Sequence, residues 1–165
     1  MPLPLPSIRQ CFFLIAAASA AMMVGALIMQ HVFEMEPCPL CITQRVFVIL
    51  AGIVALIAAL HNPAACGRRL YSGLGIVTSL AGGGVSARHV WLQHLPEDQV
   101  PTCGPGLSYM FDALPMWEAL SLLFAGDGNC AEESWRFLGL TIPGWTLVCF
   151  IALALTFAWQ AWRKA

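Results

Sequence analysis

The sequence predicts an all-α membrane protein in which four transmembrane helices form a bundle and residues 1–165 make a single domain. Of the 165 residues, 59% are hydrophobic and only 10% are charged, a composition too apolar for a soluble domain. The net charge of −1 provides no basic field that would attract nucleic acid. Four stretches approach the roughly 20 apolar residues that a spanning helix needs. We therefore place spans at about 11–30, 43–61, 70–89 and 144–162.

Each span has a boundary or packing signal. The first follows Arg9; a run of alanines in it is typical of a cleaved signal peptide, but its apolar stretch is longer than the core of such a peptide. The second ends before Asn62 and Pro63, and the fourth begins near Pro143, since proline suits a first helical turn. In the third, the segment SLAGGGVSA (79–87) supplies small residues that let helices approach closely.

The basic residues predict the orientation of the bundle. With four spans, both termini lie on the same side as the turn between the second and third spans. Because cytoplasmic segments carry the excess of lysine and arginine, the richer side is predicted to be cytoplasmic. The side with the termini carries Arg9, Arg68, Arg69, Arg163 and Lys164, and the other side carries Arg45, Arg88 and Arg136. The N- and C-termini are therefore predicted to be cytoplasmic.

Two loops then lie outside, a short one at about 31–42 and a long one at about 90–143. In the long loop, LPMWEALSLLF (114–124) places apolar residues on one helical face, which predicts a short amphipathic helix. We expect this helix to lie on the membrane surface or to pack on the protein's own outer face. In both arrangements it holds the long loop close to the bilayer.

The seven cysteines fall into two groups. Three lie in the predicted spans or in the cytoplasmic turn, where disulfides are disfavoured, and we interpret these as structural thiols. They are Cys11, Cys66 and Cys149. Four lie outside, where an oxidising compartment would favour disulfides, and four cysteines allow three complete pairings. They are Cys38, Cys41, Cys103 and Cys130.

The pair Cys38-Pro-Leu-Cys41 points to redox chemistry. A disulfide that encloses two residues removes little chain entropy, so it is a poor structural staple, and the common uses of this spacing are thiol exchange and metal binding. His31 could join the pair in a zinc site, but no second Cys-x-x-Cys or His-x-x-x-His completes the coordination, so we predict no metal site. Pro39 suits the first helical position, which makes Cys38 the N-cap and places Cys41 in the first turn. Backbone N–H groups there stabilise a thiolate.

Arg45 lies four residues after Cys41 and therefore on the same helical face. Its guanidinium can stabilise a thiolate or the oxygen of a bound acceptor. Alone, such an arginine is also typical of the end of a membrane span, where its side chain reaches toward water. Beside a Cys-x-x-Cys pair, the functional interpretation is favoured.

Taken together, these features resemble the bacterial disulfide bond formation protein B (DsbB) family. The shared features are four spans, Pro-Cys-x-x-Cys-x-x-x-Arg at the start of the second, and a distant cysteine pair in the second outer loop. Further similar stretches are RHVWLQ (88–93), PTC (101–103) and GNCAEESWRFLGLTIPGW (128–145), so the resemblance covers essentially the whole chain. It implies a multi-pass protein of the bacterial inner membrane. Such a protein reoxidises a periplasmic, DsbA-like dithiol oxidase of thioredoxin fold and passes the electrons to ubiquinone or menaquinone in the membrane.

The resemblance also implies a catalytic role for each outer cysteine. Cys103 is attacked by the partner's thiolate, and Cys130 is its disulfide companion. Electrons then move by thiol-disulfide exchange to Cys38 and Cys41, with a bond between Cys38 and Cys130 as the intermediate that joins the two loops.

Three residues are implied as quinone contacts: Cys41 as the electron donor, Arg45 beside the quinone oxygen, and His89 near the ring. Gln44 departs from the family pattern, because some relatives carry a carboxylate at this position. A proton-accepting role there is therefore in doubt for this chain.

Two other interpretations stay open at this point. A vitamin K epoxide reductase-like enzyme also has a four-helix core and a Cys-x-x-Cys, but that family places its active pair late in the bundle. A membrane scaffold or metal-handling protein with structural disulfides in its outer loops would leave Cys38 and Cys41 dispensable for electron transfer.

Overall fold

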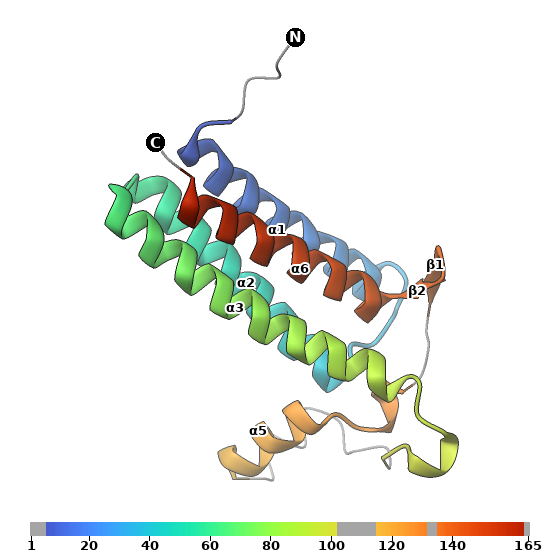
Figure 1. The fold of residues 1–165 in the computed structure, drawn as a ribbon. Helices are drawn as coiled ribbons and strands as arrows, with labels where there is room; N and C mark the ends of the chain where they lie inside the picture. Colours follow the sequence, from blue (N-terminus) through green and yellow to red (C-terminus); the bar gives the residue numbers. More distant parts are fainter. Residues whose placement is uncertain (1–5, 102–114, 132–134, 164–165) are drawn as a thin grey trace.

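Four long helices form a bundle in the computed structural model, which describes residues 6–101, 115–131 and 135–163 (Figure 1). Along the bundle, α1 packs on α2, α2 on α3, and α3 on α6. The start of α1 and the end of α6 lie at the same end. The helices span Ile8–His31 (α1), Pro39–His61 (α2), Ala65–Leu92 (α3) and Ile142–Trp162 (α6).

Short elements gather at the opposite end of the bundle (Figure 1). They are the 3-10 helices Glu97–Gln99 (η1) and Gly128–Cys130 (η2), the helix Met116–Ala125 (α5), and the strands Arg136–Phe137 (β1) and Leu140–Thr141 (β2). Helix α5 corresponds to the helix expected at 114–124 and contacts α2. The antiparallel pair β1–β2 was not predicted. Its turn residues, Leu138 and Gly139, both have positive φ, 50° and 81°, as two-residue hairpin turns often require.

The helix boundaries follow local chemistry. Ser7 caps α1, because its hydroxyl accepts from the Gln10 N–H at 3.2 Å and the Gln10 side chain accepts from the Ser7 N–H at 2.8 Å. Helix α2 begins at Pro39 and ends at Asn62, which adopts a left-handed conformation with φ 46° before Pro63. Both ends are as the sequence predicts. Helix α6 likewise begins one residue before Pro143.

Among the described residues, α1, α2 and α6 are the helices that are long and apolar enough to cross a membrane. They correspond to the first, second and fourth predicted spans. Helix α3 runs without a break through the third predicted span, 70–89, but it is less apolar because it carries arginines, glycines and serines. Its outward side chains Leu74, Val77 and Leu80 are nevertheless exposed and apolar. That α3 also crosses the membrane, as the third of four spans, stays a prediction.

Small residues on α3 allow close contact with α6. A Cβ added at Gly75 would lie 2.4 Å from the ring of Phe157, and one added at Gly82 would lie 2.4 Å from the ring of Phe150. Both phenylalanines are fully buried, in the same core as Phe12 of α1. The close approach predicted for segment 79–87 is therefore present at Gly82.

We expect Gly82→Ala to destabilise the bundle by about 1–3 kcal/mol, because the new methyl group overlaps the Phe150 ring in a packed core. Thermal unfolding in detergent measures the effect. Gly84→Ala is the matched control, since nothing lies within 4 Å of its Cβ position. The control should be neutral or slightly stabilising, because alanine favours helix over glycine. Equal unfolding temperatures for the two variants would contradict the proposed contact.

Candidate functional site

The first turn of α2 presents two cysteines. Cys38 is the N-cap, with extended backbone angles of φ −70° and ψ 166°, and Pro39 is the first helical residue, both as predicted. Cys41 follows in the first turn, and both cysteines are half-buried. The first N–H groups of a helix have no partner within it. A thiolate at Cys41 therefore faces hydrogen-bond donors and the positive end of the helix dipole.

His89, in the last turn of α3, lies against this turn of α2. Its Nε2 is 3.7 Å from the Cys38 sulfur, and its Nδ1 is 3.1 Å from the Gln44 side-chain nitrogen. His89 and Gln44 are 3% and 4% exposed. The imidazole therefore bridges Cys38 and Gln44 in a nearly dry contact between two helices. The sequence-based expectation gives His89 a contact with quinone, whereas the structure places it beside the dithiol.

Cys130, in η2, completes a cluster of sulfur atoms. Its side chain is fully buried and packs with Leu40 and Leu92, and Cys38 packs against this group. A hydrogen bond with Cys38 and, after it, burial raise the pKa of the Cys130 thiol well above its usual range. At neutral pH Cys130 is therefore protonated. The structure thus brings together Cys38 and Cys130, two residues that the resemblance pairs in an inter-loop intermediate.

The end of α5 positions η2 on the bundle. Arg88 of α3 donates to the Ala125 carbonyl oxygen from Nε at 3.1 Å and from Nη2 at 2.9 Å. Gly126 follows with φ 75°, and a Cβ there would lie 2.8 Å from side-chain atoms of Leu40 and Leu92. A larger residue here would have a strained backbone and would have to displace these two leucine side chains, so the position favours glycine. The chain then reaches Cys130 four residues later.

Cys103 lies outside the described residues, so its predicted contact with the partner and its pairing with Cys130 stay predictions. The six described cysteines are all free thiols in this structure. Of the three interpreted as structural, Cys11 is buried and Cys66 is exposed. Cys149 is half-buried, and it lines the cavity described next.

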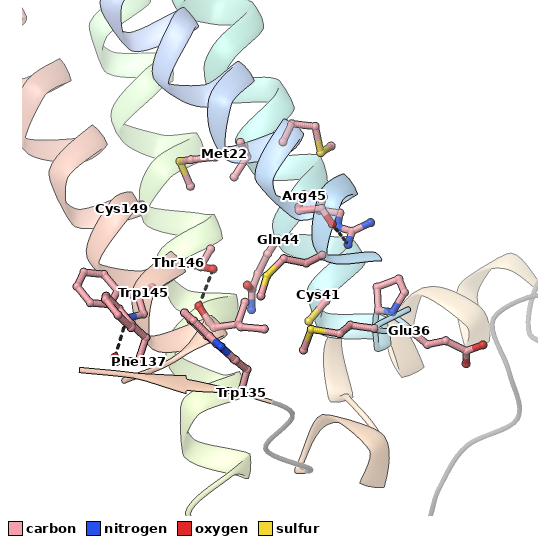
Figure 2. A pocket seen from close by; sticks show the side chains of 17 residues that line it. Met22, Glu36, Cys41, Gln44, Arg45, Trp135, Phe137, Trp145, Thr146 and Cys149 are labelled. Atoms are coloured by element: carbon pink, nitrogen blue, oxygen red, sulfur yellow. Dashed lines mark hydrogen bonds between the residues drawn. The ribbon is translucent and has the colours of Figure 1, made fainter. Parts of the chain in front are cut away.

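A cavity of about 440 Å³ lies between α1, α2 and α6 beside Cys41 (Figure 2). Its wall is largely apolar, with Arg45 and Gln44 as polar side chains from α2. The Arg45 guanidinium donates to the Gln30 side chain and, at 3.2 Å, to the Ala26 carbonyl oxygen. The other lining residues are Met22, Met23, Ala26, Met29, Met35, Glu36, Pro37, Val48, Trp135, Phe137, Ile142, Trp145, Thr146 and Cys149.

Sequence reasoning missed most of this wall. Met22 and Met29 are seven residues apart, so they share a face of α1, which was the one local signal available. Trp145 reaches the wall only because the chain folds back: its Nε1 donates to the Phe137 carbonyl oxygen at 3.0 Å, which ties α6 to β1. No local pattern indicates that contact.

A second cavity, of about 50 Å³, lies on the dithiol side. It is lined by Cys38, Cys41 and His89 together with Glu36, Gln93, Asn129, Trp135, Thr141, Ile142 and Pro143. Of the described site cysteines, only Cys41 lines both cavities, whereas Arg45 lines the larger and His89 the smaller. The larger cavity has room for an organic cofactor, and the smaller has room for an ion or a water molecule.

We expect Gly126→Ala to slow formation of a Cys38–Cys130 disulfide by roughly tenfold, because strain of about 1–3 kcal/mol at this site displaces Cys130. Reduced protein is reoxidised, quenched with an alkylating reagent and mapped by peptide mass spectrometry. Gly139→Ala is the matched control: its φ of 81° imposes the same backbone strain, but nothing lies within 4 Å of its Cβ position. The same rate in both variants would rule out this positioning role.

Comparison with known proteins identifies the family. Residues 8–160 match the family model described as disulfide bond formation protein DsbB. Proteins called disulfide bond formation protein B are similar along nearly their whole length. The one from Saccharophagus degradans is 58% identical, covering 98% of this chain and 97% of the relative. Those from Nitrosococcus oceani and Hahella chejuensis are 54% and 51% identical, covering 95% and 94% of this chain and 93% and 94% of the relatives. This membrane protein therefore belongs to the DsbB family of disulfide-generating oxidoreductases.

Proposed function

We propose that this chain reoxidises a periplasmic, DsbA-like dithiol oxidase and passes the electrons to membrane quinone. The observation that carries the proposal is the position of Cys41, whose side chain lines both the small cavity shared with Cys38 and the large cavity shared with Arg45. A sulfur at this position exchanges with thiols on one side and faces a largely apolar space on the other. Electrons that reach the Cys38–Cys41 pair by thiol exchange can therefore leave through Cys41 toward the bilayer.

The residues of the larger cavity suit a quinone. A volume of about 440 Å³ accommodates a substituted ring, and methionine side chains adapt to flat apolar surfaces. Arg45 offers a fixed positive charge to a ring oxygen, and Gln44 offers an amide. A bound quinone would supply a two-electron, two-proton acceptor. Cys41 and Arg45 are thus the residues we assign to quinone binding. His89 lines the other cavity, so its contribution to quinone runs through Gln44 and Cys38.

The outer cysteines carry electrons by exchange. The partner's thiolate attacks Cys103 of a Cys103–Cys130 disulfide, which releases Cys130. Cys130 attacks Cys38 of a Cys38–Cys41 disulfide, forms the Cys38–Cys130 bond and releases Cys41. The partner's second thiolate then frees Cys103, which attacks Cys130 and releases Cys38. The sum oxidises the partner's dithiol to a disulfide and leaves Cys38 and Cys41 as the reduced pair.

The environments of the sulfur atoms favour the step in which Cys130 displaces Cys41. Exchange proceeds toward the leaving group that is more stable as a thiolate. Cys41 lies at a helix N-terminus, where a thiolate is stabilised. Cys130 is buried with a raised pKa, so it is better accommodated in a disulfide than as an anion. The close packing of Cys38 with Cys130 supports the intermediate that joins them.

The proposal places the protein in the bacterial inner membrane as a single four-span domain, with α3 as the remaining span and the termini cytoplasmic. The apolar outer face of α3 supports its insertion, and the arginines near the start of α1 and α3 support the orientation. The amphipathic helix α5 then lies at the periplasmic surface. Its exposed Trp117 and Phe124 suit the interface of a bilayer.

We expect purified protein in detergent to oxidise reduced DsbA-like partner over many turnovers only when ubiquinone is added. Cys41→Ser should stop after at most one equivalent of partner, because its remaining cysteines hold one disulfide with no path onward. Partner oxidation is followed by thiol alkylation. Cys66→Ser, which changes an exposed thiol at the start of α3, at the other end of the bundle, is the control and should behave as wild type. Sustained turnover by Cys41→Ser, or without quinone, would refute the proposal.

We expect Arg45→Ala to lower kcat/KM for quinone by roughly 10- to 100-fold, since a hydrogen bond to a charged group contributes about 1.5–3 kcal/mol. Its exchange with the partner at Cys103 should be unchanged. Cys103→Ser should do the reverse: it blocks exchange with the partner but leaves chemically reduced protein able to reduce quinone. Both half-reactions are measured by stopped-flow spectroscopy, with Arg69→Ala as the control for loss of an exposed arginine. Equal loss of both half-reactions in each variant would contradict this division of roles.

A further inference from the structure

We propose that the reduced dithiol is also a binding site for one thiophilic divalent cation, such as Zn²⁺, with Cys38, Cys41 and His89 as its ligands. The ligand atoms of these three side chains all lie within 4.8 Å of one another. Two thiolates and an imidazole are the ligand types that zinc prefers, and three protein ligands with one open position is a recurring arrangement. The third ligand is His89, from the end of α3. From the sequence, His31 was the histidine considered, and no metal site was predicted.

The orientation of His89 fits a ligand. Its Nε2 faces the Cys38 sulfur at 3.7 Å, so that nitrogen already lies among the sulfur atoms. The other ring nitrogen, Nδ1, is 3.1 Å from the side-chain amide of buried Gln44. Metal-bound histidines generally have their second nitrogen held by such a partner, which fixes the ring and its tautomer. When Nε2 binds the cation, Nδ1 carries the proton. The Gln44 amide can accept this proton through its oxygen if its terminal oxygen and nitrogen exchange places by rotation.

The three ligands border one space of suitable size. Cys38, Cys41 and His89 all line the small cavity of about 50 Å³. A water molecule needs about 10–15 Å³ of this cavity volume, so the cavity has room for an ion with a single water at the open position. Among the described residues that line this cavity, Glu36 is the carboxylate that could bind that water. Cys130 does not line this cavity, so we do not count it as a ligand.

Charge balance favours the cation at this place. Binding converts two thiols into thiolates and releases two protons, and the imidazole stays neutral. The resulting complex of one divalent cation with two thiolates has no net charge. Two unpaired thiolates close to an apolar membrane region would be costly, and the cation removes that cost.

The metal site exists only when Cys38 and Cys41 are reduced. In a Cys38–Cys41 disulfide the sulfur atoms are bonded to each other at about 2.05 Å and carry no negative charge for a metal. Under the proposed function, the dithiol accumulates when the electron acceptor is scarce. The cation then holds the protein reduced and blocks exchange with Cys130 until the acceptor returns. This consequence rests on the proposed function, whereas binding itself does not.

Titration of the full-length protein with Co²⁺ tests binding without partner or quinone. Reduced protein in detergent, kept free of oxygen, should bind about one Co²⁺ per chain and show thiolate-to-cobalt absorption in the near ultraviolet. Added Zn²⁺ should displace the Co²⁺ and remove this band. Protein with the Cys38–Cys41 disulfide should show no such band. A negative titration would overturn the metal site but would say nothing against quinone-dependent turnover, so the two proposals are tested independently.

Variants separate this site from other thiols and imidazoles. His89→Gln and Cys38→Ser should weaken Co²⁺ binding by at least about 100-fold, and Gln44→Leu by roughly 10- to 100-fold through the freed Nδ1. Cys66→Ser and His94→Gln change exposed residues and should have no effect. The proposal is overturned if reduced protein gives no thiolate band, if disulfide-containing protein binds equally, or if the exposed-residue variants weaken binding as much as His89→Gln.

Discussion

The contact between the first turn of α2 and the last turn of α3 determines how the end of the bundle opposite the termini is built. His89 reaches across this contact to Cys38 and Gln44, and Leu40 and Leu92 close it on the side of Cys130. Because the polar contact is buried, its groups must remain paired. This pairing fixes the position of α2 relative to α3 along the bundle axis. The Gly126 turn and the Cys130 thiol both pack on the surface that results.

A second consequence of this geometry is a separation of chemical environments. The dithiol side of Cys41 contains imidazole, amide and thiol groups, whereas its other side is a wall of methionine and aromatic side chains with one arginine. Arg45 is held by two groups of α1, so its charge does not depend on a bound molecule for its position. Preorganised charge of this kind is more effective than charge that must move into place.

Local signals predicted the elements well. Pro39, Asn62 and Pro143 mark helix ends by their own backbone preferences, and each is found at the expected boundary. The Cys-x-x-Cys spacing indicated redox chemistry without any tertiary information. The match to the DsbB family then favours that interpretation over the vitamin K epoxide reductase-like and scaffold alternatives.

The unpredicted parts all depend on distant contacts. His89 meets Cys38 from 51 positions away, and Trp145 reaches the cavity through a hydrogen bond to Phe137 in a hairpin whose strands have two residues each. Such short strands leave no periodicity to read. The weak hydropathy of α3 has a related cause, since the residues that lower it include the glycines that admit the rings of α6.

The packing of the α6 phenylalanine rings against the α3 glycines has a consequence for biogenesis. As the proposed third crossing, α3 leaves the ribosome before Phe150 and Phe157 of α6 have been made. Until then the sites at Gly75 and Gly82 lack the phenylalanine rings of α6, although Phe47 of α2 is already beside Gly82. The arginines and serines of α3 meanwhile weaken its own insertion. On the proposed topology, retention of α3 in the bilayer is completed only by synthesis of α6, so a chain truncated before α6 is expected to lose the third crossing as well as the fourth.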